Sequence, residues 1–254
     1  MGYELLETDS QVTTYYSLLI FMPGKFIVID GTDGSGKETQ TKILINTLNE
    51  KGYPVAKIDF PQYGQKSACL VEEYLSGKYG TADEVGPYIA SIFYAADRYD
   101  ASFKIKEWLK QGKIVVADRY VSANMGHQGC KIADDSEREK YLDWLYDLEY
   151  NKFGIPKPNL NIILHVPAHI AQQLSLQRET NHRGQNLKRD IHEQDINHLK
   201  QAEKTYLYIS EKYSDFTKIE CTKDDQMMTR EEISDIVWKK IEDMLENRHL
   251  YPSY

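Results

Sequence analysis

The feature that most constrains this chain is a glycine-rich loop that stands between an apolar run and a helical pattern. The run at 26–30 is short and rich in branched residues, which is typical of a strand buried on both faces of a parallel sheet. Residues 31–37 then match G-x-x-x-x-G-K, and apolar side chains recur at helical spacing over 39–51. In this order, the loop N–H groups and the helix N-terminus point at one anion. The sequence therefore predicts a phosphate-binding loop.

We expect this loop to bind the phosphates of ATP, with Lys37 reaching the β- and γ-phosphates. The next position departs from the pattern, because Glu38 stands where a Ser or Thr hydroxyl usually helps to bind Mg²⁺. The carboxylate of Glu38 either contacts the metal through water or faces solvent. The residues predicted to bind ATP are Gly31, Thr32, Asp33, Gly34, Ser35, Gly36, Lys37, Glu38 and Thr39.

Strand and helix patterns alternate along the rest of the chain. This alternation predicts an α/β fold of the P-loop three-layer type, with a parallel sheet flanked by helices on both faces. Ligands of such sheets bind at the carboxyl ends of the strands. Beyond the first strand, the patterns predict strands at 55–60, 113–118, 160–166 and 216–219, and helices at 39–51, 67–76, 86–110, 135–152, 168–179, 190–213 and 229–247.

No linker or repeat divides the 254 residues, so we predict a single domain over 22–254. Residues 1–21 are expected to be a poorly ordered N-terminal extension that is dispensable for activity. This extension has no basic stretch before its short apolar run and no arginine, which argues against a secretory signal or a mitochondrial transit peptide. No apolar run of the chain is long enough to cross a bilayer, so we expect no membrane partner.

Net charge and cysteine usage restrict the partners and the compartment. The formal net charge of −8 repels polyanions, so we expect no nucleic-acid interface. The three cysteines, Cys69, Cys130 and Cys221, are far apart and odd in number. They form neither a metal-ligand pair nor a disulfide framework, which favours reduced thiols in a cytoplasmic protein.

A charged pair follows the predicted strand at 113–118. Asp118 and Arg119 face the ligand edge of the sheet, where both are costly unless they meet charge. Asp118 can hold magnesium and Arg119 can clamp a phosphate with two parallel hydrogen bonds; the alternative is a mutual salt bridge that fixes a turn. A GTPase switch would need D-x-x-G here, and Val121 occupies the glycine position. Residues 222–225 match N-K-x-D only loosely and are better explained as a solvated turn.

Five segments, in order and at the right spacings, resemble the thymidylate kinase family. The resemblance extends from about residue 25 to the C-terminal helix. It implies transfer of phosphate from Mg·ATP to dTMP, giving dTDP on the route to dTTP, by direct in-line attack. It also implies a homodimer packed through helices, for which 86–110 is a candidate face. The five segments are 31–40, 60–65, 94–98, 118–124 and 190–195.

The resemblance also assigns roles in binding dTMP. Asp33 matches an aspartate near the acceptor 3′-hydroxyl and the metal, and Tyr94 matches the ring that stacks on thymine. Arg98 donates to the base carbonyl in the family, which together with Asn124 favours a 4-keto pyrimidine. His127 falls where a ring crowds the sugar 2′ position. The residues predicted to bind this substrate are Asp33, Phe60, Tyr63, Tyr94, Arg98, Arg119, Asn124, His127 and Gln128.

Several of these positions have a structural alternative. Tyr94 can be a core residue on an apolar helix face, and Asn124 can be a helix cap. Arg98 can pair with Asp97 or Asp100 at the surface. Many family members carry Arg where this chain has Gln62, which removes one expected phosphate contact.

The polar, basic segment 177–190 occupies the place of the lid that closes over ATP in the family. The loop itself carries no cation at Gly34 or Ser35, so the resemblance implies that Arg178 and Arg183 of the lid stabilise the transferred phosphoryl group. The predicted catalytic residues are Lys37, Asp33, Arg119, Arg178 and Arg183, and the predicted Mg²⁺ ligands are Asp33 and Asp118.

Two other functions stay open from the sequence. Gln62 and His127 are compatible with a kinase for another nucleoside monophosphate, such as dUMP or a purine nucleotide. Glu38 is compatible with a relative that binds nucleotides without turnover. The predicted partners are therefore ATP and dTMP as small-molecule substrates, together with a second copy of the chain.

Overall fold

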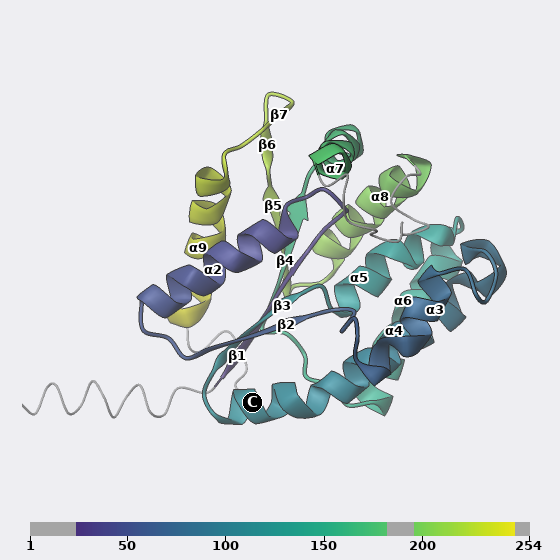
Figure 1. The fold of residues 1–254 in the computed structure, drawn as a ribbon, viewed down its shortest axis with the longest axis horizontal. Helices are drawn as coiled ribbons and strands as arrows, with labels where there is room; N and C mark the ends of the chain where they lie inside the picture. The colour runs from purple at the N-terminus through teal and green to yellow at the C-terminus, as the bar shows by residue number, and fades with distance from the viewer. Residues whose placement is uncertain (1–23, 182–195, 247–254) are drawn as a thin grey trace, which may run out of the picture.

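The structure, a computed structural model, describes residues 24–181 and 196–246, so the predicted extension 1–21 lies outside the described residues. Its centre is a parallel sheet in the order β2-β3-β1-β4-β5 (Figure 1). Every pair of neighbouring strands is parallel, as the alternation of strands and helices predicted. The strands are β1 (Lys25–Asp30), β2 (Val55–Asp59), β3 (Ile114–Asp118), β4 (Leu160–His165) and β5 (Phe216–Glu220).

The central strand, β1, is buried along its whole length because it has a neighbour on each edge and helices on each face. Its Ile27 lies opposite Val116 of β3 and Leu160 of β4. Strands β2 and β3 lie on one side of β1, and the later strands β4 and β5 lie on its other side. The carboxyl ends of β1 and β3 therefore meet beside the point where the strand order reverses, which is the usual ligand site of such sheets.

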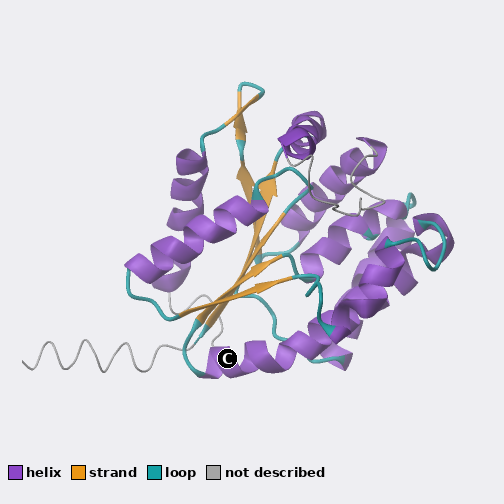
Figure 2. Ribbon diagram, in the orientation of Figure 1, coloured by secondary structure: helices purple, strands orange, loops and turns teal. Residues whose placement is uncertain are grey.

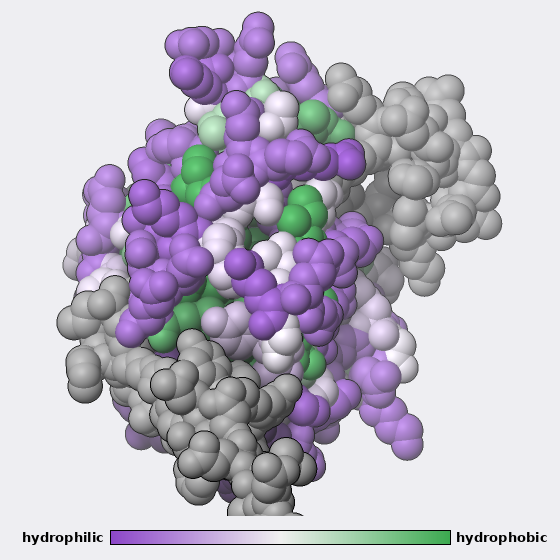
Figure 3. All heavy atoms as spheres, turned by 90° about the vertical axis from the view of Figure 1, so that its left-hand side faces the viewer, coloured by the Kyte–Doolittle hydropathy of each residue, from purple (hydrophilic) through white to green (hydrophobic). Residues whose placement is uncertain are grey.

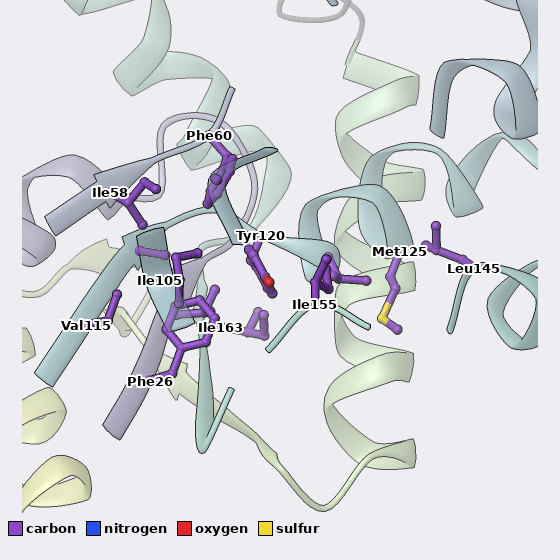
Figure 4. Packing of buried hydrophobic residues seen from close by; sticks show 14 of the residues in the cluster. Phe26, Ile58, Phe60, Ile105, Val115, Tyr120, Met125, Leu145, Ile155 and Ile163 are labelled. Carbon is purple, nitrogen blue, oxygen red and sulfur yellow. The ribbon is translucent and has the colours of Figure 1, made fainter. Parts of the chain in front are cut away.

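One face of the sheet packs against α4 (Ala82–Lys110), α5 (Val121–His127), α6 (Asp135–Tyr146) and α8 (Ile196–Lys212), as Figure 2 shows. Alternate side chains of β1 point to this side, and Phe26 meets the ring of Tyr120 edge-on at 4.9 Å (Figure 4). Tyr120 directly follows the charged pair after β3, so this core supports the ligand edge of the sheet.

The other face packs against α2 (Lys37–Glu50), α9 (Arg230–Glu246) and the start of α7 (Ala168–Asn181). The intervening side chains of β1, Ile27 and Ile29, point to this side. Both α8 and α9 are amphipathic, with their apolar residues turned to the sheet. Figure 3 shows that the outer surface on the α2 and α9 side is mostly hydrophilic.

The element boundaries differ from the predicted ones where the chain changes helix type. The predicted helix 135–152 is α6 followed by a π-helical segment, Asp147–Lys152. α4 is kinked at Gly86, whose φ is 73°. Residues 66–76 form a 3₁₀ turn, Lys66–Ala68, and then α3 (Cys69–Leu75). The predicted helix 190–213 is described from Ile196 onward, as α8.

Three short elements were not predicted at all. They are α5, the 3₁₀ turn Gly129–Lys131 and a hairpin of β6 (Thr222–Lys223) and β7 (Gln226–Met227). The two residues between the hairpin strands have positive φ angles of 51° and 56°, as a two-residue turn requires. The predicted solvated turn is therefore confirmed for residues 224 and 225, which are exposed, whereas residues 222 and 223 belong to β6. In the described ranges, no helix is both long and apolar enough to span a membrane.

Candidate active site

A cavity of about 260 Å³ opens at the carboxyl ends of β1, β2 and β3. The loops after these three strands supply most of its wall, and one face of α4 closes it. All nine residues predicted to bind the acceptor line this one cavity, although they come from four separate segments. Its lining residues are Asp33, Phe60, Pro61, Tyr63, Tyr94, Asp97, Arg98, Arg119, Tyr120, Ala123, Asn124, His127 and Gln128.

The glycine loop closes against α7 through Gly34. The φ of Gly34 is 84°, a left-handed value that side chains rarely adopt. A Cβ atom at this position would also lie 2.3 Å from the backbone oxygen of Ala171. Because glycine satisfies both demands, the loop can turn tightly and still pack onto the first turn of α7.

Lys37 begins α2 and folds back into the loop. Its ammonium donates to the backbone oxygen of Thr32 at 2.9 Å and lies 3.6 Å from Asp33 Oδ1. Burial lowers the pKa of Lys37, and the nearby Arg119 cation lowers it further against the attraction of Asp33. The side-chain hydroxyls of Thr32 and Ser35 are buried without a hydrogen-bond partner in the described part of the chain. A loop with buried cations and unpaired donors is suited to a polyanion.

A second cavity, of about 310 Å³, borders the other part of the same loop. Thr39 lines it as predicted, whereas Glu38 does not: Glu38 pairs with Lys42 at 2.6 Å, and both side chains are more than half exposed. The sequence reasoning missed the far wall, because the β6–β7 hairpin and α9 carry no motif. The lining residues are Gly34, Ser35, Gly36, Thr39, Gln40, Leu174, Met227, Met228, Arg230 and Ile233.

Arg119 projects from a strained position into the acceptor cavity. Its φ of 67° is left-handed, which costs a non-glycine residue about 1–3 kcal/mol and is typical of functional sites. Its guanidinium forms an ion pair with Asp33 and contacts Nε2 of His127 at 3.1 Å. Burial alone would raise the pKa of Asp33, but Arg119 and Lys37 outweigh it and hold that pKa below its ordinary value. The alternative of an Asp118–Arg119 salt bridge is therefore wrong.

The contact with Arg119 defines the state of His127. A guanidinium can only donate, so Nε2 of His127 accepts and the neutral ring carries its proton on Nδ1. Burial lowers the pKa of His127 well below its ordinary value, despite the attraction of Asp33. The edge of the Tyr206 ring packs against His127 at 5.6 Å between ring centroids. His127 is thus a neutral acceptor for Nη1 of Arg119, while Asp33 accepts from Nη2.

A buried carboxylate that the sequence reasoning missed joins these parts. Asp30, at the end of β1, accepts from the backbone N–H of Gly31 at 2.8 Å and from Ser122 Oγ at 2.6 Å. It also accepts from the hydroxyl of Tyr206 at 3.0 Å. Asp30 therefore ties the glycine loop to α5 and α8. No sequence signal distinguished it from an ordinary polar end of a strand.

Arg98 is buried rather than paired at the surface. Its Nε donates to Glu149 Oε2 at 2.7 Å and its Nη2 to Glu149 Oε1 at 2.5 Å. Its Nη1 donates to the backbone oxygen of Tyr120 at 3.3 Å. The alternatives with Asp97 or Asp100 are therefore wrong, because Arg98 points from α4 into the interior. It still lines the acceptor cavity, as its predicted role requires.

Asn124 presents an acceptor to the same cavity. It lies inside α5 rather than at its start, so the helix-cap alternative is wrong. Its Nδ2 donates to the backbone oxygen of Ser91 at 3.2 Å. This bond orients the amide and leaves Oδ1 as the atom that can accept from a ligand. Tyr94 also lines the cavity, and its ring packs edge-on against Tyr74 at 6.3 Å. Its predicted stacking role is therefore compatible with its position.

Gln62 bonds to α4 instead of pointing freely at the cavity. Its backbone N–H donates to Asp97 Oδ2 at 2.8 Å, and its side-chain amide donates to Asp97 Oδ1 at 3.1 Å. Ser67 also donates to Asp97 Oδ1, at 2.6 Å. Asp97, which the sequence reasoning did not assign, thus fixes the loop after β2 beside Tyr63.

The carboxylates predicted to hold Mg²⁺ differ in their surroundings. Asp33 is already paired with Arg119 and Lys37. Asp118 makes no side-chain hydrogen bond within the described ranges, and burial raises its pKa against the attraction of Lys37 and Arg119. A half-buried carboxylate without a hydrogen bond, beside a loop suited to phosphates, fits a hard divalent cation. Of the two predicted Mg²⁺ ligands, Asp118 is therefore chemically suitable as it stands, whereas Asp33 is shared with two cations.

The side chains of the two predicted lid arginines lie outside the described residues. Arg178 belongs to α7, but its side chain lies outside the described residues, and Arg183 lies outside them entirely. Their assignment as catalytic cations stays a prediction.

Comparison with known proteins identifies the family. The sequence profile of the family described as Thymidylate kinase matches residues 29–233. The chain belongs to the thymidylate kinase family. The matched stretch includes the whole glycine loop and every residue of the acceptor cavity. The resemblance inferred from the five sequence segments is confirmed.

The similarity extends to relatives from distant organisms. The chain is 32% identical to the thymidylate kinase of Mycobacterium tuberculosis over 169 residues, which is 65% of this chain and 78% of that protein. It is 30% identical to the Homo sapiens thymidylate kinase over 144 residues, 56% of this chain and 61% of that protein. A solved Candida albicans thymidylate kinase shares the fold, with a TM-score of 0.65 at 22% identity, covering 87% of this chain and 92% of that one.

Proposed function

We propose that this chain phosphorylates dTMP to dTDP with Mg·ATP, by direct in-line transfer on the route to dTTP. The observation that carries the proposal is that one glycine loop borders two cavities, so that a donor and an acceptor can meet across Arg119 and Lys37. Membership of the thymidylate kinase family supports dTMP as the acceptor. An oxygen of the acceptor phosphate attacks the γ-phosphorus, and the bond to the β–γ bridging oxygen breaks to release ADP.

The transfer depends on aligned cations rather than on a catalytic base, because the acceptor phosphate is largely ionised near neutral pH. Lys37 and Arg119 stabilise the charge that spreads over the moving group. Mg²⁺ held at Asp118 and Asp33 would neutralise charge on the β- and γ-phosphates. Residues 177–190 act as a lid in this proposal, with Arg178 and Arg183 adding positive charge as they close over ATP.

The base is selected by donors and acceptors at fixed places. Arg98 presents only N–H groups, which suit the 4-keto oxygen of thymine and repel the 4-amino group of cytosine. Asn124 Oδ1 accepts the N3–H of the same ring. Tyr94 stacks on the base, and His127 crowds the 2′ position, so that a deoxyribose is preferred.

The proposal is tested by measuring ADP release with Mg·ATP and dTMP, dUMP, dCMP, UMP, AMP and GMP offered one at a time. The expected result is a strong preference for dTMP, with dTDP identified as the product. Turnover of a different monophosphate would overturn the assignment of Tyr94, Arg98 and Asn124 to thymine. ATP binding without turnover of any acceptor would identify a non-catalytic relative.

We further propose that two copies pair through α4. Its outer face carries an exposed apolar stripe at helical spacing: Ile89 is 50% exposed, Ile92 39%, Tyr99 43% and Phe103 61%. Such a stripe on one helix is typical of an interface between subunits. Burial of this exposed stripe against the same stripe of a second copy would favour a homodimer.

The dimer is tested by Phe103→Glu, with sedimentation as the measurement and Ile236→Glu on α9 as the control. Ile236 is also partly exposed, on the opposite side of the sheet. We expect Phe103→Glu to be monomeric and Ile236→Glu to behave as the wild type. A Phe103→Glu variant that stays dimeric would exclude this face.

We also propose a cytoplasmic location, which is supported by three cysteines that are free in the described residues.

A further inference from the structure

A buried acid lies in an unusual backbone segment after α6. After α6 the chain continues as a π-helical segment, Asp147–Lys152. Such wide turns are rare and occur frequently at functional sites. Within this segment, Glu149 has no exposed surface. A fully buried carboxylate is costly unless it is paired, so its position requires an explanation.

The partner of Glu149 is Arg98, which is 1% exposed. Both carboxylate oxygens accept from one edge of the guanidinium, from Nε at 2.7 Å and from Nη2 at 2.5 Å. This two-point geometry fixes the plane of the guanidinium as well as its place. A third donor, on Nη1, is used by the backbone oxygen of Tyr120.

A guanidinium has five N–H donors, so these three bonds leave two for a ligand. Arg98 lines the acceptor cavity and Glu149 does not. The carboxylate therefore stands behind the arginine, on the side away from the ligand. The support is itself rigid, because Tyr120 packs against Phe26 and donates from its hydroxyl to the backbone oxygen of Pro156 at 3.1 Å.

We propose that Glu149 is a positioning residue that sets the base specificity of the acceptor site by holding Arg98 in one orientation. This rests on the proposed function of Arg98 as a donor to the 4-keto oxygen of the acceptor base. Without its carboxylate, the long side chain of Arg98 has several rotamers, and its free N–H groups no longer point to one place. The site then loses contact with a 4-keto group and also loses its repulsion of a 4-amino group.

The main rival explanation is that the pair only joins α4 to the segment after α6. A purely structural pair would change stability and would leave the ratio of kcat/KM for dTMP and dCMP unchanged. The proposal requires that ratio to change, together with the KM for dTMP, while the KM for ATP stays the same. These readouts separate positioning from structural support.

The test uses Glu149→Gln, which keeps the shape of the side chain and removes its charge. We expect KM for dTMP to rise by up to about 10²-fold, which is the cost of a small displacement of a positioned group. KM for ATP should stay within about twofold, and the dTMP to dCMP ratio should fall about tenfold or more. A folded Glu149→Gln enzyme with an unchanged ratio overturns the inference.

Two further variants keep the result interpretable. In an Arg98→Met background, Glu149→Gln should cause no further loss of the ratio, because Glu149 acts only through Arg98; an additional loss of the same size would overturn the inference. Glu149→Asp keeps the charge on a shorter side chain, so its ratio should lie between those of the wild type and Arg98→Met even if Glu149→Gln does not fold; a less stable Glu149→Asp enzyme with the wild-type ratio would count against the proposal.

A matched control for stability is Asp215→Asn. Asp215 accepts from Asn161 Nδ2 at 3.0 Å and lies away from the cavity. It should lower stability without changing the ratio. Wild-type enzyme that fails to phosphorylate dTMP would defeat the proposed function itself, whereas active wild type with an unaffected Glu149→Gln defeats only this inference.

Discussion

The two halves of the active site are built by different means. The phosphate-binding part of the donor half is a run of consecutive residues after β1, and most of its shape comes from backbone N–H groups and glycine conformations. The acceptor half is made of side chains from the loops after β1, β2 and β3 and from α4 and α5, which are held by ion pairs and hydrogen bonds. A phosphate can therefore be bound by local backbone geometry, whereas a base needs side chains that come from distant parts of the sequence.

The difference has an energetic reason. Backbone N–H groups at a helix N-terminus are oriented by the helix itself and need no outside support. Long side chains such as Arg98 and Arg119 must be fixed by charges that the fold brings to them. Each buried charge is costly without its partner, so the acceptor half is more sensitive to changes in distant residues.

The largest expected effect is at Lys37, a buried cation of the donor half. Lys37→Met should lower kcat by about 10²–10³-fold, because it removes a preorganised charge from the transferred phosphoryl group. Lys42→Met is the matched control, since Lys42 lies on the same helix and pairs with Glu38 in solvent. Steady-state turnover of dTMP measures both. Equal turnover of the two variants would remove Lys37 from the mechanism.

The next prediction asks how much the donor loop depends on tertiary contact. Gly34 and Gly36 both have left-handed φ angles, of 84° and 87°, so alanine costs each about 1–2 kcal/mol. Only at Gly34 does a Cβ atom meet the backbone of Ala171; at Gly36 it meets nothing within 4 Å. Gly34→Ala should therefore be less stable than Gly36→Ala by about 1–3 kcal/mol. Chemical denaturation without ligand measures the difference, and equal stabilities would show that the contact with α7 is unimportant.

The third prediction addresses the acceptor half through a single ring. Tyr94→Leu should weaken dTMP binding by about 1–3 kcal/mol, or about 5- to 150-fold, because stacking on the base is lost. ATP binding should be unchanged. Phe93→Leu is the control on the same helix, where the ring packs against Tyr74 and Tyr79 instead of lining the cavity. Titration calorimetry with each nucleotide measures the affinities of both variants. An equal loss of affinity for dTMP in Tyr94→Leu and Phe93→Leu would contradict stacking.

The smallest expected effect is a pH dependence that belongs to the acceptor half alone. The pKa of His127 is depressed in the fold, so the unfolded chain binds its proton first. The neutral His127 ring therefore contributes fully to the free energy of unfolding above the unfolded-state pKa of about 6.5. This contribution is lost as the pH falls from there toward the lower pKa of His127 in the fold. The loss is at most about 1.4 kcal/mol for each pH unit in that window.

His127→Gln keeps an acceptor for Arg119 but does not titrate. We expect the free energy of unfolding of the wild type to fall more steeply than that of the variant between about pH 6.5 and 5. Denaturation curves at several pH values give the two slopes. Parallel slopes would mean that His127 is protonated in the fold and does not accept from Arg119.

The parts that could be predicted from sequence are those with a local or periodic cause. The glycine loop was found because strand, turn and helix follow one another within the same stretch. The parallel sheet was predicted because buried strands and amphipathic helices alternate, and all five strands were found within a residue or two. The nine acceptor residues were assigned by resemblance to the family, and the fold brings all of them to one cavity.

The parts that could not be predicted have non-local causes. Arg98 was given the wrong alternatives, Asp97 and Asp100, because a helix pattern does not show which way a buried charge points. Its partner, Glu149, lies 51 positions along the chain in a segment that was predicted as ordinary helix. The far wall of the donor cavity, with Met227 and Arg230, has no motif at all.

By itself, the sequence determined the donor loop, the class of fold and the segments that carry the chemistry, since backbone conformation and strand burial follow from neighbouring residues. Only the tertiary structure decided the partners of the buried charges: Glu149 for Arg98, Asp33 and His127 for Arg119, and Tyr206 for Asp30. The physical reason is that a charge removed from water takes whichever opposite group the packing brings within hydrogen-bonding distance. That choice depends on the whole arrangement of helices over the sheet.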